Sequence, residues 1–129
     1  MSVRLWLPGE RPVSWNTLKR LHYRRWQERV DAAKQLMRVA LADTLGPNPG
    51  DWPMFEGPVH ISMTAWFDHH PIDATNLPLK LYEDGLIGLI IPDDGYKYVP
   101  DASLHTRKAG NGREPGVEII VEEANGHVG

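Results

Sequence analysis

The sequence of 129 residues contains no cysteine, so disulfide bonds and thiolate metal ligands are excluded. A metal ion bound by this chain would need oxygen or imidazole ligands. Long hydrophobic runs are also absent, and no segment reaches the length of a membrane span. The first residues lack the apolar stretch of a signal peptide, so we expect a cytoplasmic protein without membrane contact.

The chain also lacks the positive net charge that is usual for nucleic-acid-binding proteins, since its formal net charge is −3. The charges are nevertheless distributed unevenly. Basic residues gather between positions 19 and 38 and again between 97 and 113, whereas acidic residues gather between 68 and 94. Because local potential guides a charged ligand more than total charge does, the net charge alone does not exclude DNA as a partner.

Hydrophobic residues make up 41% of the chain and charged residues 24%, as in one ordinary globular domain. We expect a single domain over residues 1–129, with residues 123–129 as a loose tail. Alternating or apolar patterns predict strands at residues 4–7, 59–67, 96–106 and 117–121.

Two helices complete the predicted fold. Apolar residues recur at spacings of three and four from Trp26 to Ala40, which predicts an amphipathic helix that ends near Leu45. A second helix is predicted from about Thr75 to Leu86. The order strand, helix, strand, helix, strand, strand favours a mixed β-sheet with two helices packed on it, an α/β (α+β) fold.

Acidic residues and one lysine accompany the second predicted helix. Asp73 lies at its start, Lys80 and Asp84 lie one turn apart on it, and Asp93 and Asp94 occupy the turn that follows. If the helix packs back along the sheet, these carboxylates converge and require a cation to neutralise them. Carboxylate oxygens suit Mg²⁺ or Mn²⁺. Such an ion activates water for phosphodiester hydrolysis, and a nearby lysine stabilises phosphate charge.

Each of these pieces also has a purely structural interpretation. Pro-Asp-Asp-Gly at residues 92–95 favours a turn in any protein. Asp73 or Thr75 could simply cap a helix. Lys80 and Asp84 form an ordinary i,i+4 pair on many solvated helix faces. It is the order of the three pieces along the chain that favours a functional site.

A longer pattern contains these residues. Residues 73–86 have the sequence Asp-Ala-Thr-Asn-Leu-Pro-Leu-Lys-Leu-Tyr-Glu-Asp-Gly-Leu, and Ile-Pro-Asp-Asp-Gly-Tyr-Lys-Tyr-Val follows at 91–99. Upstream, Pro-Val-Ser-Trp-Asn at residues 12–16 is followed by Tyr23. Together with a basic loop before the last strand, this order resembles the RusA family of Holliday junction resolvases over nearly the whole chain.

The resemblance implies a homodimeric endonuclease that uses Mg²⁺, or Mn²⁺ in its place, to cut paired strands of four-way DNA junctions. Such enzymes act in DNA recombination and repair, often in phage or prophage genomes. By position, the resemblance implies catalytic roles for Asp73, Lys80 and Asp94. It also implies metal ligation by Asp73 and Asp94, with Asp93 or Asp84 assisting.

The chain departs from the family pattern in two places. Thr75 stands where the second aspartate of the Asp-x-Asp motif belongs, and the spacing from Asn76 to Lys80 is one residue longer. A neutral hydroxyl is a poorer ligand for Mg²⁺ than a carboxylate. The alternative hypothesis is therefore a catalytically weakened module of the same fold that still binds branched DNA.

The basic residues are the expected DNA contacts, because phosphate contacts hold DNA without depending on its sequence. They are Lys19, Arg20, Arg24 and Arg25 in the first group, and Arg107, Lys108 and Arg113 in the second. A solvated helix face is the alternative interpretation of the first group. The apolar parts of the N-terminal strand and the first helix are the expected dimer surface.

Histidines and tryptophans are further candidates for binding a ligand. His69 and His70 could bind a transition metal, although adjacent loop histidines are more often simply solvated. The tryptophans at positions 15, 26, 52 and 66 could stack on bases, but core or dimer contacts are the more usual use of so large a side chain. Trp26 lies on the apolar helix stripe and is expected in the core.

Overall fold

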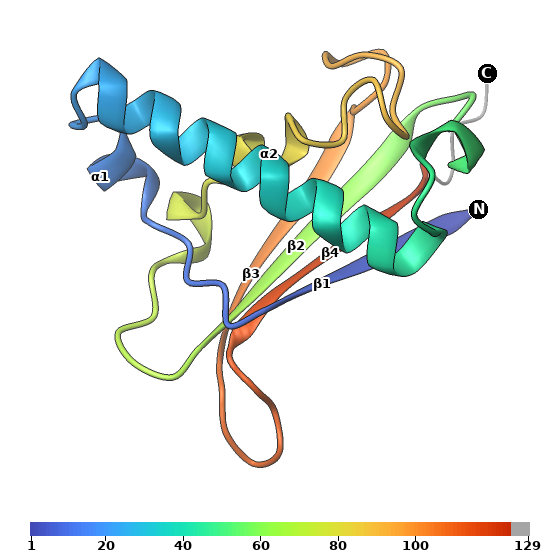
Figure 1. Cartoon of the computed structure of the whole chain (residues 1–129). Helices are drawn as coiled ribbons and strands as arrows, with labels where there is room; N and C mark the ends of the chain where they lie inside the picture. Colours follow the sequence, from blue (N-terminus) through green and yellow to red (C-terminus); the bar gives the residue numbers. More distant parts are fainter. Residues whose placement is uncertain (125–129) are drawn as a thin grey trace.

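A four-stranded mixed sheet forms the centre of the molecule, in a computed structural model that describes residues 1–124. Its strands are β1 (Ser2–Pro8), β2 (Val59–Phe67), β3 (Asp101–Lys108) and β4 (Gly116–Glu123). They lie side by side in the order β1-β4-β2-β3 (Figure 1). β4 runs antiparallel to both of its neighbours, whereas β3 runs parallel to β2. The expected α+β architecture with a mixed sheet is therefore confirmed.

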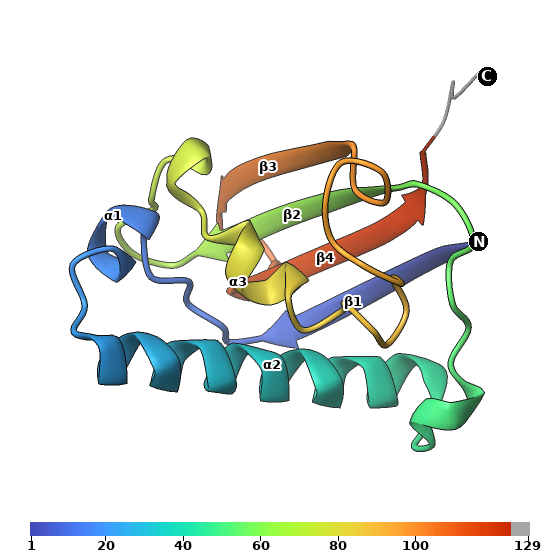
Figure 2. The same cartoon turned by 90° about the horizontal axis from the view of Figure 1, so that it is seen from above.

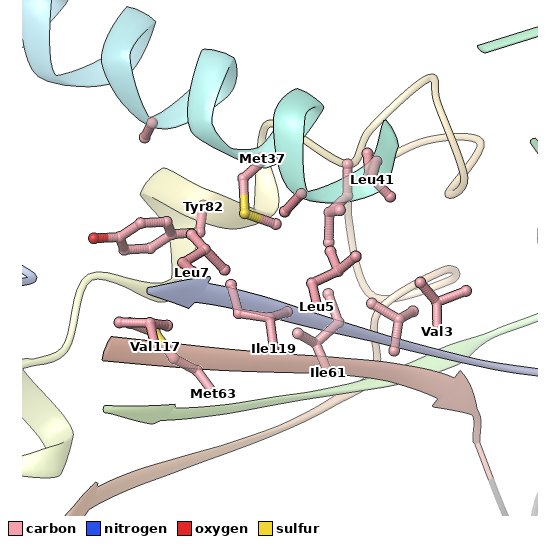
Figure 3. Close-up of a cluster of buried hydrophobic side chains, with 14 of the residues drawn as sticks. Val3, Leu5, Leu7, Met37, Leu41, Ile61, Met63, Tyr82, Val117 and Ile119 are labelled. Atoms are coloured by element: carbon pink, nitrogen blue, oxygen red, sulfur yellow. The ribbon is translucent and has the colours of Figure 1, made fainter. Parts of the chain in front are cut away.

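The long helix α2 (Tyr23–Leu45) packs along one face of this sheet (Figure 2). Every second residue of a strand faces α2, because successive side chains of a strand point to opposite faces of the sheet. Val3, Leu5 and Leu7 of β1 are buried, as are Met37 and Leu41 of α2 (Figure 3). This apolar layer is the core of the fold, and it follows the spacing seen in the sequence.

Burial in this core bears on the dimer surface expected from the sequence. The apolar residues of β1 and the apolar stripe of α2 are buried within the chain itself. The fully buried residues are therefore unavailable to a dimer partner, whereas Trp26 and Val30 of the same stripe are only partly buried, and the dimer surface stays a prediction. Their burial leaves only isolated large hydrophobic side chains exposed on α2, such as Val39. None of the helices within residues 1–124 combines the length and the apolar character needed to cross a bilayer.

The second predicted helix is broken into two short pieces. A 3₁₀ turn, η2 (Ala74–Asn76), is followed by the short helix α3 (Leu79–Glu83). Pro78 separates them, because a proline forces the preceding residue out of the helical region. Leu77 accordingly has φ −73° and ψ 133°. The prediction of one continuous helix from about Thr75 to Leu86 is therefore wrong.

Other boundaries differ from the expectation as well. β3 begins at Asp101 rather than at Tyr96, since residues 96–100 form a turn that ends in Pro100. β4 continues to Glu123, which pairs with Val59, so the predicted tail does not begin at residue 123. The rest of that tail, residues 125–129, lies outside the described residues. Two short elements were not predicted, α1 (Trp15–Leu18) and the 3₁₀ turn η1 (Pro49–Asp51).

Candidate active site

The crossover connection between β2 and β3, residues 68–100, carries most of the predicted site residues. It contains η2 and α3, and hydrogen bonds tie it to β3 and to α1. Thr106 of β3 donates a hydrogen bond from Oγ1 to the carbonyl oxygen of Ile72, at 2.7 Å. The backbone N–H of Asn16, in α1, donates to Oδ1 of Asn76, at 3.1 Å. The turn that follows Asp73 is thereby held between β3 and α1.

Lys80, in the first turn of α3, is the centre of an acidic cluster. Its Nζ lies 2.9 Å from Oδ2 of Asp94, 3.1 Å from Oδ1 of Asp84 and 3.1 Å from Oε2 of Glu83. Asp84 and Glu83 follow on the same helix, whereas Asp94 comes from the turn before β3. The lysine therefore fastens the end of the crossover to its helix. With 49% of its side chain exposed, Lys80 also remains accessible to a ligand.

The charges in this cluster reinforce one another. Partial desolvation by itself lowers the pKa of Lys80, but the contacts with Asp94, Asp84 and Glu83 outweigh it and raise that pKa above its ordinary value of 10.5. The same ammonium lowers the pKa of Asp94 below its usual value. At neutral pH the pair is therefore an ammonium with a carboxylate. Lys80 has no proton-accepting capacity there, so it can supply charge but not act as a base.

The remaining predicted site residues lie close by in the chain but outside this cluster. Asp93 accepts a hydrogen bond at Oδ1 from the backbone N–H of Asp94, at 2.8 Å, so it fixes the turn that presents Asp94. Asp73 and Thr75 are both exposed on η2, and the Asp73 carboxylate does not cap that turn. Within residues 1–124, the ion pairs of Lys80 are those with Glu83, Asp84 and Asp94, and Asp73 is not among them.

The residues around Lys80 match the chemistry of Mg²⁺ in one respect and not in another. Carboxylate oxygens are the donors that a hard divalent cation prefers. In the described part of the chain, however, no three His, Asp or Glu side chains are arranged to hold a metal ion. Asp84 and Asp94 are instead arranged around the Lys80 ammonium. The donor type therefore fits Mg²⁺, while the arrangement is that of carboxylates neutralised by a lysine. His69 and His70 are likewise in no such group.

Two polar residues near the site were missed by sequence reasoning. Glu83 is only 9% exposed although it is charged, and Lys80 supplies its counter-charge. Its position three residues after Lys80 was the available signal. Tyr82 is buried and donates a hydrogen bond to Oε2 of Glu10, at 2.7 Å. Burial and the Glu10 carboxylate raise the pKa of Tyr82. No local pattern marks a contact between residues so distant in the sequence.

The two basic groups lie at different places on the surface. Lys19, Arg20, Arg24 and Arg25 are exposed where α1 passes into α2, and Arg107 and Lys108 are exposed at the end of β3. Arg113, in the hairpin before β4, stacks on Trp66, with 3.6 Å between the guanidinium carbon and the ring centroid. Trp66 therefore supports that hairpin. Trp52 is buried and donates to the carbonyl oxygen of Gly46, so it is a structural residue.

The prediction for Trp26 agrees with the structure, since its ring is partly buried and packs against the core cluster. Its edge contacts Trp15, with ring centroids 5.8 Å apart.

Comparison with known proteins adds no further information on the site. Neither a scan against protein-family models nor a search of curated proteins finds a match for this chain.

Proposed function

We propose that this chain is a cytoplasmic, Mg²⁺-dependent endonuclease of the RusA type that acts as a homodimer on branched DNA such as a four-way junction. One observation carries the proposal. The motif order predicts that Lys80, Asp84 and Asp94 act together, and these three side chains are in contact although Asp94 comes from a separate turn. The contact between Lys80 and Asp94 joins two separate pieces of the motif across 14 positions of the chain.

In this proposal, each predicted site residue has a part in phosphodiester cleavage. Asp94 and Asp73 would hold the ion, with Asp84 assisting and Asp93 fixing the turn at Asp94. Mg²⁺, or Mn²⁺ in its place, would supply an activated water and positive charge at the phosphate. Lys80 remains an ammonium at neutral pH, so it would stabilise the charge that develops on the phosphate oxygens.

The exposed basic groups would position the DNA through its phosphates. They are Lys19, Arg20, Arg24 and Arg25 near α1, with Arg107 and Lys108 at the end of β3 and Arg113 in the segment before β4. A two-fold symmetric dimer presents two equivalent sites, which suits paired cuts in a symmetric junction.

The test uses a labelled synthetic four-way junction and a linear duplex, each with Mg²⁺, with Mn²⁺ and with chelator. We expect symmetric nicks in the junction alone, which chelator and Asp94→Asn abolish. Asp43→Asn, which changes an exposed aspartate of α2, is the matched control and should cut normally. Absence of cutting by the folded wild-type protein with either metal would overturn the enzymatic proposal.

A second function is favoured by one specific observation, the neutral Thr75 at a position where the nuclease pattern has an aspartate. The chain would then be a module that binds branched DNA without cutting it. Salt-sensitive binding to the junction, with no nicks under either metal, is the result that this alternative predicts.

A further inference from the structure

The corner between α1 and α2 contains a hollow that the proposed cleavage chemistry does not use. It has a volume of about 380 Å³ and is lined by Leu18, Lys19, Leu21, Tyr23 and Trp26. Leu18 is buried, whereas the Tyr23 side chain is 73% exposed. The edge contact with Trp15, at an interplanar angle of 72°, holds the Trp26 ring in place. The hollow thus combines a fixed apolar wall with an exposed aromatic ring.

Lys19 lines this hollow, and Arg20, Arg24 and Arg25 are chain neighbours of its lining residues. Lys19, Arg20, Arg24 and Arg25 are all exposed, and within residues 1–124 none of them takes part in an ion pair. The first turn of α2 contains no acidic residue. Its two arginines therefore face the positive end of the helix dipole, an arrangement that costs stability. An anion bound beside the hollow would relieve this repulsion.

The hollow is also connected to the predicted cleavage site. The hydrogen bond from Asn16 N–H to Asn76 Oδ1 joins α1 to the turn that follows Asp73. In both views, α1, the start of α2 and this turn, coloured yellow-green, lie at the same end of the molecule (Figures 1 and 2). A nucleic acid strand bound at one of these places would therefore pass near the other.

We propose that the hollow binds one unstacked base of DNA, with the Tyr23 ring stacked on the base and the four exposed cations on the adjacent phosphates. A nucleotide joins a flat aromatic ring to an anion by a short tether, and the hollow offers the matching surfaces at short range. The choice of branched DNA as the source of that base rests on the proposed function. The hollow, the exposed Tyr23 ring and the exposed cations are observed independently of that proposed function.

The first measurement is equilibrium binding in the presence of chelator, so that cleavage plays no part. The probes are a labelled four-way junction and a single-stranded oligonucleotide, each with and without one abasic position. We expect Tyr23→Ala to weaken binding about 5- to 100-fold, the range for loss of one base–aromatic stack. Tyr23→Phe should bind within about twofold of wild type, because it keeps the ring. Val39→Ala, at an exposed site on the same helix, is the matched control and should bind normally.

A fluorescent base analogue placed at an unpaired position distinguishes stacking from general charge attraction. Its emission should be quenched by the wild-type protein and by Tyr23→Phe, but not by Tyr23→Ala. Unchanged affinity of Tyr23→Ala, or displacement of DNA by an acidic peptide at the same charge concentration, would overturn the inference. If the protein cuts no DNA but binding depends on Tyr23, the nuclease proposal fails and the base site stands. If it cuts DNA but Tyr23 is dispensable for binding, the reverse holds.

Discussion

The layer between α2 and the sheet and the crossover at residues 68–100 share one apolar core but differ in how much single polar contacts add to it. Leu5, Met37 and Ile61 are fully buried among other apolar side chains. The crossover contributes Leu86, Ile90 and Ile91 to the same core, but its irregular backbone is also held by single polar contacts, such as those of Thr106 and Tyr82. Apolar burial is non-directional and is shared among many neighbours, whereas each polar contact depends on one pair of atoms. The core therefore sets the stability of the fold, and the crossover sets the position of the site.

The largest expected effect tests the core. Met37→Ala removes a fully buried side chain from the centre of the layer, and we expect it to lower the free energy of unfolding by about 2–5 kcal/mol. Val39→Ala, two residues along the same helix but 48% exposed, should change it by less than about 0.5 kcal/mol. Urea denaturation measures both. Similar losses in the two variants would show that stability does not reside in this layer.

The next effect is expected where the two regions touch. Gly85 follows Asp84 and packs against α2 so closely that an added Cβ would lie 2.8 Å from Cβ of Met37. Gly85→Ala should therefore force the crossover away from α2 and cost about 1–3 kcal/mol. Gly57→Ala is the control, because an added Cβ there meets no atom within 4 Å. A stable Gly85→Ala variant that keeps the wild-type affinity for DNA would mean that the two regions are not mechanically linked.

The contrast between the regions also explains what the sequence could predict. Strand β2 and helix α2 were predicted almost to the residue, because Val59–Phe67 alternates and residues 26–40 recur at helical spacing. Burial of one face imposes such periods on a sequence. In the crossover no period exists, and a single proline, Pro78, decided the local structure.

The candidate site was predictable in part for the same reason. Lys80, Asp84 and Asp94 followed from the order of a local motif, and they are in contact. Whether Asp73 joins them depends on how the crossover folds, which no local pattern encodes. The contact between Tyr82 and Glu10 joins residues 72 positions apart, so only the three-dimensional fold reveals it.

A smaller loss is expected when one directional contact of the crossover is removed. Tyr82→Phe keeps the buried ring but leaves the Glu10 carboxylate without its donor, at a cost of about 1–2 kcal/mol. The pH dependence identifies the group. The pKa of Tyr82 is raised in the folded protein above its ordinary value of 10.0, so its stabilisation is complete below pH 10 and declines as the pH rises further.

The difference between Tyr82→Phe and wild type should therefore shrink above pH 10. Denaturation curves collected at several pH values from 7 upward measure it. A constant difference across this range would show that the pKa of Tyr82 is not raised in the folded protein, so that its hydroxyl is neither desolvated nor bound to Glu10.

The smallest expected effect concerns the cluster itself. Lys80→Gln leaves Glu83, Asp84 and Asp94 without their shared ammonium, but the site is half exposed, so the loss should be about 1 kcal/mol or less. If these carboxylates are a cation site, Mg²⁺ should raise the melting temperature of Lys80→Gln more than that of wild type, because the ion no longer competes with the lysine. Lys108→Gln, at the exposed end of β3, is the control and should respond to Mg²⁺ as wild type does. Equal responses of all three proteins would mean that the lysine only balances charge within the crossover, and the binding-module alternative would then gain over the nuclease.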